Sequence, residues 1–196
     1  MAPLITRLLA GAGYETSELR VNWVDLAQVP GLSNATGRLG MTFLPGKRFS
    51  GRAGDHWRDL KTDAAVLHHL HELDTLLLLV EDSELESARV RGIEAALEAN
   101  GIELLRHPIR DMGIPTDRPA FAQTLGELLR RLQDGKRVAV ACMGGLGRTG
   151  TVVGCLLRDA GLDAEAAISL ARATRAGTIE TSGQEAFVRG WRATDT

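Results

Sequence analysis

Cysteine is scarce in this sequence, and its scarcity excludes one class of fold. The 196 residues include two cysteines, Cys142 and Cys155. Small secreted domains that are held together by disulfides carry many more, so two cysteines favour a reducing compartment. We therefore predict a cytoplasmic protein without a disulfide framework.

An excess of positive charge is also missing. Lysine and arginine number 23 against 25 aspartates and glutamates, which gives a formal net charge of -2. A general binder of nucleic acids or membrane surfaces would normally carry a basic excess. We therefore predict neither partner, and any attraction for an anionic substrate must come from a local site.

Long hydrophobic runs are absent as well. The longest spans residues 75–80, which is the length of a buried strand and far short of a membrane helix. The opening residues 1–13 contain one basic residue and a short apolar stretch, a poor match to a signal peptide. We predict a single, monomeric domain over residues 1–196, with residues 1–18 as a loosely ordered arm.

The chain does contain short apolar runs that alternate with longer amphipathic stretches. Strands are predicted near residues 21–26, 41–44, 76–80, 102–108 and 137–141. Helices are predicted over residues 55–73 with Asp55 as N-cap, 84–99, 117–133, 148–159 and 164–173. Strands joined by helical crossovers form parallel sheets. The predicted fold class is therefore α/β, with a central, mostly parallel sheet of about four to five strands and helices on both faces.

Residues 137–150 form the most informative segment, because an apolar strand runs into a glycine-rich turn and then a helix. The glycines allow a tight turn in which successive N–H groups point inward and bind an anion, and the helix adds its positive N-terminal end. The turn is predicted to bind a substrate phosphate through Met143, Gly144, Gly145, Leu146 and Gly147.

Three side chains at this turn are candidates for chemistry. Cys142 at its mouth is predicted to be a thiolate, stabilised by the N–H groups and by Arg148, and hence a nucleophile at neutral pH. Arg148 offers a planar fork to two phosphate oxygens. Thr149 is placed to donate a hydroxyl hydrogen bond to the thiolate. A lone cysteine is more often a small buried core residue, but the pattern Cys-x5-Arg-Thr-Gly favours catalysis.

Attack on a phosphate ester also needs a proton donor for the leaving oxygen. Asp111 is the candidate, because it lies directly after a strand that should run parallel to the strand of Cys142, and both strand ends would share one sheet edge. The alternative for Asp111 is a solvated turn residue. Asp117 is a rival acid, whose place at a helix start predicts N-capping instead.

Two nucleotide-binding folds also place glycines in such a turn. The spacing of Gly145, Gly147 and Gly150 matches the dinucleotide fingerprint. That fold needs a further strand with an acidic residue for the ribose, and the fewer than fifty residues after Gly150 are helical in pattern. A nucleotide P-loop would need a lysine where Arg148 stands. Both interpretations are therefore disfavoured.

Neither the histidine cluster nor the second cysteine predicts a further site. His68, His69 and His71 with Glu72 could suggest a metal, yet they lie in a helical pattern in which His68 and Glu72 form an ordinary i, i+4 pair. We predict no metal site. Cys155 is predicted to pack in the core, with a regulatory disulfide to Cys142 as a remote alternative.

With these residues in view, the chain resembles a known superfamily. Residues 141–150 resemble the signature of the protein tyrosine and dual-specificity phosphatases. Residues 40–49, 107–113 and 178–184 resemble the branch of the cyclin-dependent kinase-associated phosphatases, so that the likeness spans residues 20–190. It implies no metal or other cofactor, a phosphocysteine intermediate and phosphoprotein substrates.

The resemblance also implies roles by position. Cys142, Arg148 and Asp111 become nucleophile, phosphate clamp and general acid. Gln184 resembles the glutamine that positions the hydrolytic water in some members, with a surface helix residue as the alternative. The chain departs from the family at Ala141, where a histidine is usual, so one contribution to thiolate stabilisation is missing.

The sequence therefore predicts a metal-independent tyrosine or dual-specificity phosphatase that acts through a phosphocysteine. The variable loop residues 143–147 carry no charge, which favours a phosphoprotein or small phosphate ester over a phosphoinositide. The kinase partner of the family is not carried over, because partner recognition depends on surface residues that no motif fixes. Two alternatives stay open: a catalytically weak phosphate-binding module of the same fold, and a rhodanese-like sulfur transferase.

Overall fold

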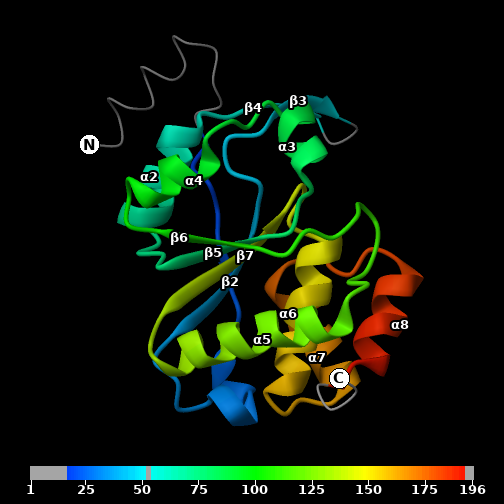
Figure 1. Ribbon diagram of the computed structural model, residues 1–196. Helices are drawn as coiled ribbons and strands as arrows, with labels where there is room; N and C mark the ends of the chain where they lie inside the picture. Colours follow the sequence, from blue (N-terminus) through cyan, green and yellow to red (C-terminus); the bar gives the residue numbers. More distant parts are fainter. Residues whose placement is uncertain (1–16, 52–53, 193–196) are drawn as a thin grey trace.

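The computed structural model describes residues 17–51 and 54–192, and it is built around one mixed sheet (Figure 1). The strand order is β1-β2-β7-β5-β6, with β1 antiparallel to β2 and every other neighbouring pair parallel. The strands are β1 (Asn22–Trp23), β2 (Arg38–Phe43), β5 (Thr75–Leu78), β6 (Glu103–Arg106) and β7 (Arg137–Cys142). The predicted α/β class is confirmed, and each predicted strand is present. The predicted N-terminal arm lies almost wholly outside the described residues.

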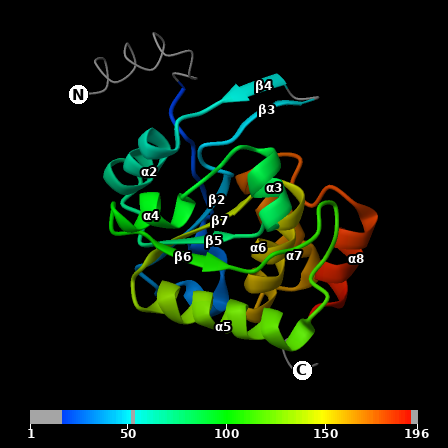
Figure 2. The same cartoon turned by 45° about the horizontal axis from the view of Figure 1, so that its top comes forward.

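Helices cover both faces of this sheet, and two views agree on their placement (Figures 1 and 2). On one side lie α2 and α4, and on the other α5, α6, α7 and α8. The helices are α2 (Leu60–His69), α3 (Asp82–Ser87), α4 (Ile93–Glu98), α5 (Arg118–Gln133), α6 (Gly147–Asp159), α7 (Ala164–Thr174) and α8 (Ser182–Gly190), with short 3-10 turns at Leu26–Gln28 and Pro30–Leu32. None of these described helices has the length and hydropathy that a membrane span requires.

The central strand β7 contributes to two separate hydrophobic cores. Val138 and Val140 belong to the core under α5 to α8, whereas Ala139 and Ala141 belong to the core under α2 and α4. Successive side chains of a strand point to opposite faces, which explains the alternation. Because both neighbours of β7 are strands, its end at Cys142 is fixed in the middle of the carboxyl edge of the sheet.

The helix predicted over residues 55–73 is wrong at both ends. Residues up to Trp57 form strand β4 (Gly54–Trp57), which pairs with β3 (Arg48–Gly51) in a separate hairpin that lies close to α3. Asp59 rather than Asp55 caps α2, since its side chain accepts a hydrogen bond from the Thr62 N–H. A buried ion pair between Arg58 and Asp63 at 2.7 Å fixes this start, and no local periodicity could have indicated it.

The single helix predicted over residues 84–99 is also wrong. It is divided into α3 and α4, because Arg89 and Gly92 adopt left-handed φ angles of 55° and 68°. A left-handed residue ends the hydrogen-bond ladder of a right-handed helix. The helix predicted from residue 117 is confirmed as α5, and Asp117 is its N-cap as expected. The helix α8 was not predicted.

Candidate active site

The turn from β7 into α6 curls around the sulfur of Cys142. This residue is 3% exposed, and the Gly145 N–H donates a hydrogen bond to Cys142 Sγ at 3.2 Å. Gly145 has a left-handed φ of 70°, and a Cβ at this position would lie 2.3 Å from the Thr42 carbonyl oxygen. Only glycine fits there. The sequence-predicted turn therefore directs at least one backbone donor at the cysteine.

Arg148 lies in the first turn of α6, and a carboxylate holds it there. Its Nη1 and Nη2 atoms lie 2.7 and 2.8 Å from the two carboxylate oxygens of Glu84 on α3, and Nη1 also donates to the Ile109 carbonyl oxygen at 2.9 Å. The side chain of Arg148 is 2% exposed and that of Glu84 is 16% exposed. Two parallel bonds of this kind fix the plane of a guanidinium as well as its position.

Charge and burial act in opposite directions on this pair. Burial disfavours the charged form of Arg148, but the hydrogen bonds that it donates to Glu84 and the nearby charge of Cys142 raise the pKa of the guanidinium above its ordinary value. Burial likewise works against ionised Glu84, yet the Arg148 hydrogen bond lowers the pKa of that carboxyl. Both groups are therefore charged at neutral pH. Sequence reasoning missed Glu84, although its place just after β5, at the same sheet edge as Cys142, was a usable signal.

Asp111 reaches the same guanidinium from the loop after β6. Its Oδ1 lies 2.9 Å from Arg148 Nη2, and its side chain is 67% exposed. The loop is shaped by Met112, whose φ is left-handed at 58°, and by a hydrogen bond from the Gly113 N–H to the Arg110 carbonyl. Two segments that are distant in the sequence, the Asp111 loop and the Cys142 turn, are thus brought together at Arg148.

The predicted partner of Thr149 is not bonded to it in this structure. Thr149 is fully buried, and its Oγ1 has no hydrogen-bond partner within the described chain, so the expected bond to Cys142 Sγ is not formed. A buried hydroxyl without a partner is costly. Thr149 therefore keeps a free donor at the base of the turn.

Gln184 is fully buried in the first turn of α8, so the alternative of a surface residue is wrong. Its Oε1 accepts a hydrogen bond from the Glu180 N–H at 2.9 Å, and its Nε2 donates to the Gly113 carbonyl at 3.2 Å. The side chain therefore connects α8 to the loop of Asp111.

Three further charged side chains touch the turn, and the sequence did not indicate them. Glu180 accepts a hydrogen bond from the Gly147 N–H at 2.8 Å. Lys47 Nζ donates to the Met143 carbonyl at 3.2 Å, and Arg175 Nη2 donates to the Gly144 carbonyl at 3.1 Å. The Gly147 N–H, which was predicted to donate a hydrogen bond to phosphate, is thus bonded to a carboxylate of the protein. The carbonyls of Met143 and Gly144 accept hydrogen bonds from cations outside the turn.

The remaining candidates lie away from this site. Within the described residues, no group of three or more histidines, cysteines or carboxylates is arranged to hold a metal. Glu72 lies beyond the end of α2 and pairs with Arg137, so the predicted helical pair with His68 is wrong. Cys155 is a free thiol in the core, as predicted, and burial raises its pKa well above the ordinary value.

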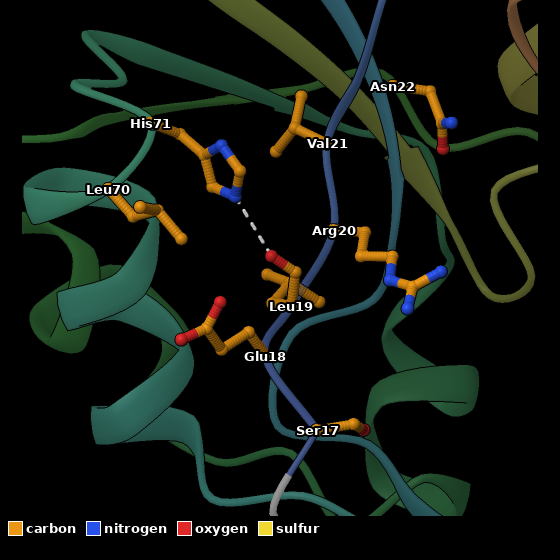
Figure 3. Close-up of a pocket in the computed structure, with 8 residues that line it drawn as sticks. All are labelled: Ser17, Glu18, Leu19, Arg20, Val21, Asn22, Leu70 and His71. Carbon is orange, nitrogen blue, oxygen red and sulfur yellow. Dashed lines mark hydrogen bonds between the residues drawn. The ribbon is translucent and has the colours of Figure 1, made fainter. Parts of the chain in front are cut away.

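A cavity of about 470 Å³ lies between the segment before β1 and the end of α2. It is lined by residues 17–22 with Leu70 and His71, and a ring nitrogen of His71 lies 2.9 Å from the Leu19 carbonyl oxygen (Figure 3). No residue of the Cys142 turn lines it.

The site combines a buried thiol, a fixed guanidinium and an exposed carboxylate at one sheet edge. A thiolate is a nucleophile, a guanidinium binds two oxygens of a phosphate, and a carboxylic acid can protonate a leaving oxygen. The arrangement is suited to phosphoryl transfer to sulfur.

Comparisons with known proteins show similarity to phosphatases. Cyclin-dependent kinase inhibitor 3 from Homo sapiens is 29% identical over 181 residues, which cover 91% of this chain and 81% of that protein. The crystal structure of kinase associated phosphatase, with its catalytic-site cysteine replaced by serine, matches with a TM-score of 0.81 at 27% identity and covers 92% of this chain and 97% of that one. Tk-PTP in its active form matches with a TM-score of 0.60 at 27% identity, over 77% and 88% of the two chains.

A family model described as "Swiss Army Knife protein, DSP-PTPase phosphatase domain" matches residues 58–188. This range contains Glu84, Asp111, Cys142 and Arg148. The resemblance to the cyclin-dependent kinase-associated branch of the dual-specificity phosphatases is likewise confirmed by its relatives. The chain therefore belongs to the DSP-PTPase phosphatase domain family.

Proposed function

We propose that this protein is an active, metal-independent phosphatase that hydrolyses phosphate monoesters of proteins, on tyrosine and on serine or threonine, through a phosphocysteine. The observation that carries the proposal is that Arg148, whose guanidinium is fixed by Glu84, contacts Asp111 and lies near enough to Cys142 for their charges to interact. A family match alone gives the fold and the signature. This geometry supports the proposal because it brings a thiol, a guanidinium and a carboxylate to one sheet edge.

The first step transfers the phosphoryl group to sulfur. The phosphate of the substrate binds to the N–H groups of the turn and to Arg148, and there it replaces Asp111 at Nη2. In the role of general acid, Asp111 carries the proton that the leaving oxygen receives. As Cys142 Sγ bonds to phosphorus, the ester P–O bond breaks, and Asp111 transfers its proton to the leaving oxygen.

The second step hydrolyses the phosphocysteine and regenerates the Cys142 thiolate. Asp111, now a carboxylate, takes a proton from a water molecule that attacks phosphorus, and the S–P bond breaks to release inorganic phosphate and the thiolate. Thr149 supplies a hydroxyl hydrogen bond to the departing sulfur, for which its Oγ1 is unengaged in the present structure. Gln184 holds the Asp111 loop through Gly113 and thereby positions the base.

A protein substrate is supported by the surroundings of the site. Loop residues 143–147 carry no positive side chain that would favour a highly phosphorylated lipid. Met112 and Ile114 are exposed hydrophobic side chains on the Asp111 loop, and they offer an apolar surface for the segment that carries the phosphate. The names of the relatives, kinase inhibitor and kinase associated phosphatase, agree with a phosphoprotein class and specify no partner for this chain.

A second function is supported by specific features of the site. Two carboxylates, those of Asp111 and Glu180, contact the donors that would hold phosphate. In addition, Ala141 stands where the family resemblance implies a histidine. These features favour slow turnover, and at the limit the protein would be a phosphate-binding module of the same fold. The two functions differ in whether the phosphocysteine is hydrolysed.

The test is hydrolysis of p-nitrophenyl phosphate in the presence of a chelator. We expect turnover by the parent, none by Cys142→Ser, and a loss of about a hundredfold or more by Asp111→Ala. Cys155→Ala and Asp134→Ala are matched controls, since both lie outside the site, and they should keep parental rates. An inert parent that still binds vanadate would establish the binding module. A separate assay, in which the outer sulfur of thiosulfate is transferred to cyanide and sulfite is released, would establish the sulfur transferase if it showed turnover.

A further inference from the structure

One peptide group of the Cys142 turn is hydrogen-bonded at both of its ends. Arg175 Nη2 donates to the Gly144 carbonyl oxygen at 3.1 Å, and the Gly145 N–H donates to Cys142 Sγ at 3.2 Å. The carbonyl of Gly144 and the N–H of Gly145 belong to the same peptide unit, which is planar and points its C=O and N–H in opposite directions. A continuous chain of two hydrogen bonds therefore runs from the guanidinium of Arg175 to the sulfur.

Arg175 is held in place by β1, the outermost strand on one side of the sheet. It follows α7 directly, and its Nη1 donates to Asn22 Oδ1 on β1 at 2.8 Å. Its Nε is buried and has no hydrogen-bond partner among the residues that the structure describes. Burial lowers the pKa of Arg175, while the nearby charge of Cys142 acts in the opposite direction. A guanidinium stays charged in proteins, so a partly buried cation lies close to the sulfur.

The charges around the turn make this cation important. Arg148 shares its charge with two carboxylates, Glu84 and Asp111, and a third carboxylate, Glu180, lies on the Gly147 N–H. Within residues 17–51 and 54–192, no carboxylate pairs with Arg175. The groups that face the turn are thus three anions, from Glu84, Asp111 and Glu180, and three cations, from Lys47, Arg148 and Arg175.

We propose that Arg175 is a positioning residue that stabilises the Cys142 thiolate through the Gly144–Gly145 peptide. Arg175 thereby compensates for the histidine that is usual in the family at the position of Ala141. A cation on the carbonyl oxygen polarises the peptide and strengthens the hydrogen bond of its N–H. The same contact fixes the orientation of the peptide, because rotation would turn the N–H of Gly145 away from sulfur. This inference rests on the proposed phosphatase function, since it assigns a device that keeps the nucleophile ionised.

The experiment measures alkylation of Cys142 by iodoacetamide, which needs the thiolate but no turnover. Cys155 is buried in the core and does not compete in the folded protein. Rates at pH 6 and pH 9.5 are compared for the parent, Arg175→Gln and Arg175→Lys, with Asn22→Ala as a milder variant that frees the guanidinium. Arg130→Gln on α5 removes the same charge from an exposed site and is the control. Hydrolysis of p-nitrophenyl phosphate is measured in parallel.

We expect Arg175→Gln to slow alkylation at pH 6 by about tenfold, because the loss of one charge-assisted hydrogen bond shifts the ionisation of the Cys142 thiol by about this factor. At pH 9.5 the rate should change little. Arg175→Lys and Asn22→Ala should lie between parent and Arg175→Gln, and Arg130→Gln should match the parent. Equal rates for Arg175→Gln and the parent at pH 6 would overturn the inference. So would an equal loss at both pH values, because that indicates a collapsed turn.

The failure of this inference is distinguishable from failure of the proposed function. If the parent is alkylated rapidly at pH 6 and hydrolyses the ester while Arg175→Gln behaves identically, only the role of Arg175 is refuted. If the parent neither hydrolyses the ester nor reacts at pH 6, the proposed phosphatase function itself is refuted.

Discussion

Replacing Glu84 by glutamine tests how far catalysis depends on the support of Arg148. The substitution keeps the shape of the side chain and one oxygen acceptor, but it removes the charge and places an NH₂ group against a guanidinium N–H. Breaking a buried ion pair costs about 3–5 kcal/mol. Because Asp111 and the Ile109 carbonyl still contact Arg148, we expect the lower end, about 3 kcal/mol.

The matched control is Glu103→Gln. Glu103 also forms a bidentate pair, with Arg131 at 2.7 and 2.9 Å, but its side chain is 54% exposed. Exposed pairs contribute about 0–1 kcal/mol. For a chain of this size, 1 kcal/mol shifts the midpoint of thermal unfolding by about 2–4 °C, so Glu84→Gln should lower it by about 6–12 °C and Glu103→Gln by a few degrees at most.

The catalytic rate and the pH dependence of stability are two further measurements on Glu84→Gln. A guanidinium held by one bond instead of two is displaced from the phosphate, and misplacement of about 1 Å costs about a hundredfold in rate. The pKa of Glu84 is lowered from an ordinary value near 4.5, so its stabilising contribution is complete above that pH and is lost as the pH falls through the folded-state value. Equal stability and activity in Glu84→Gln and Glu103→Gln would refute the reasoning.

Two further substitutions have expected outcomes. Gly145→Ala forces a Cβ to within 2.3 Å of the Thr42 carbonyl at a left-handed φ, so kcat/KM should fall at least a hundredfold, whereas Gly126→Ala on α5, where a Cβ meets nothing within 4 Å, should leave activity intact. Glu180→Gln removes the anion on the Gly147 N–H, so inorganic phosphate should inhibit about threefold to tenfold more tightly in steady-state assays. Weaker phosphate inhibition would contradict the assignment of Glu180 as a competing anion.

The sheet and the central turn could be predicted because their signals are local. Each strand of the sheet is indicated by a short apolar run, and the glycines between Cys142 and Arg148 specify a turn that few residue types permit. Asp111 could be placed near Arg148 because carboxyl ends of parallel strands share one edge of the sheet. These inferences needed only periodicity and topology.

The wrong and missing predictions concern features that depend on tertiary packing. The division between α3 and α4 occurs at Arg89, a residue type that gives no sign of a left-handed angle. The supports of the turn, Glu84, Glu180 and Arg175, come from three different elements, and their pairing with Arg148, Gly147 and Gly144 depends on how those elements pack. The place of Glu84 just after β5 was a usable signal, but no spacing in the sequence encodes the contacts of Glu180 and Arg175.

The central claim is that Cys142 accepts the phosphoryl group. Its most direct test is acid quenching of the enzyme during turnover of an aryl phosphate, followed by mass spectrometry of the peptide that contains Cys142. We expect one phosphoryl group on Cys142 in the parent, a larger fraction in Gln184→Ala because the Asp111 loop loses its tether, and none in Cys142→Ser. Continued hydrolysis without any phosphorylated Cys142, or with the phosphoryl group on another side chain, would contradict the account.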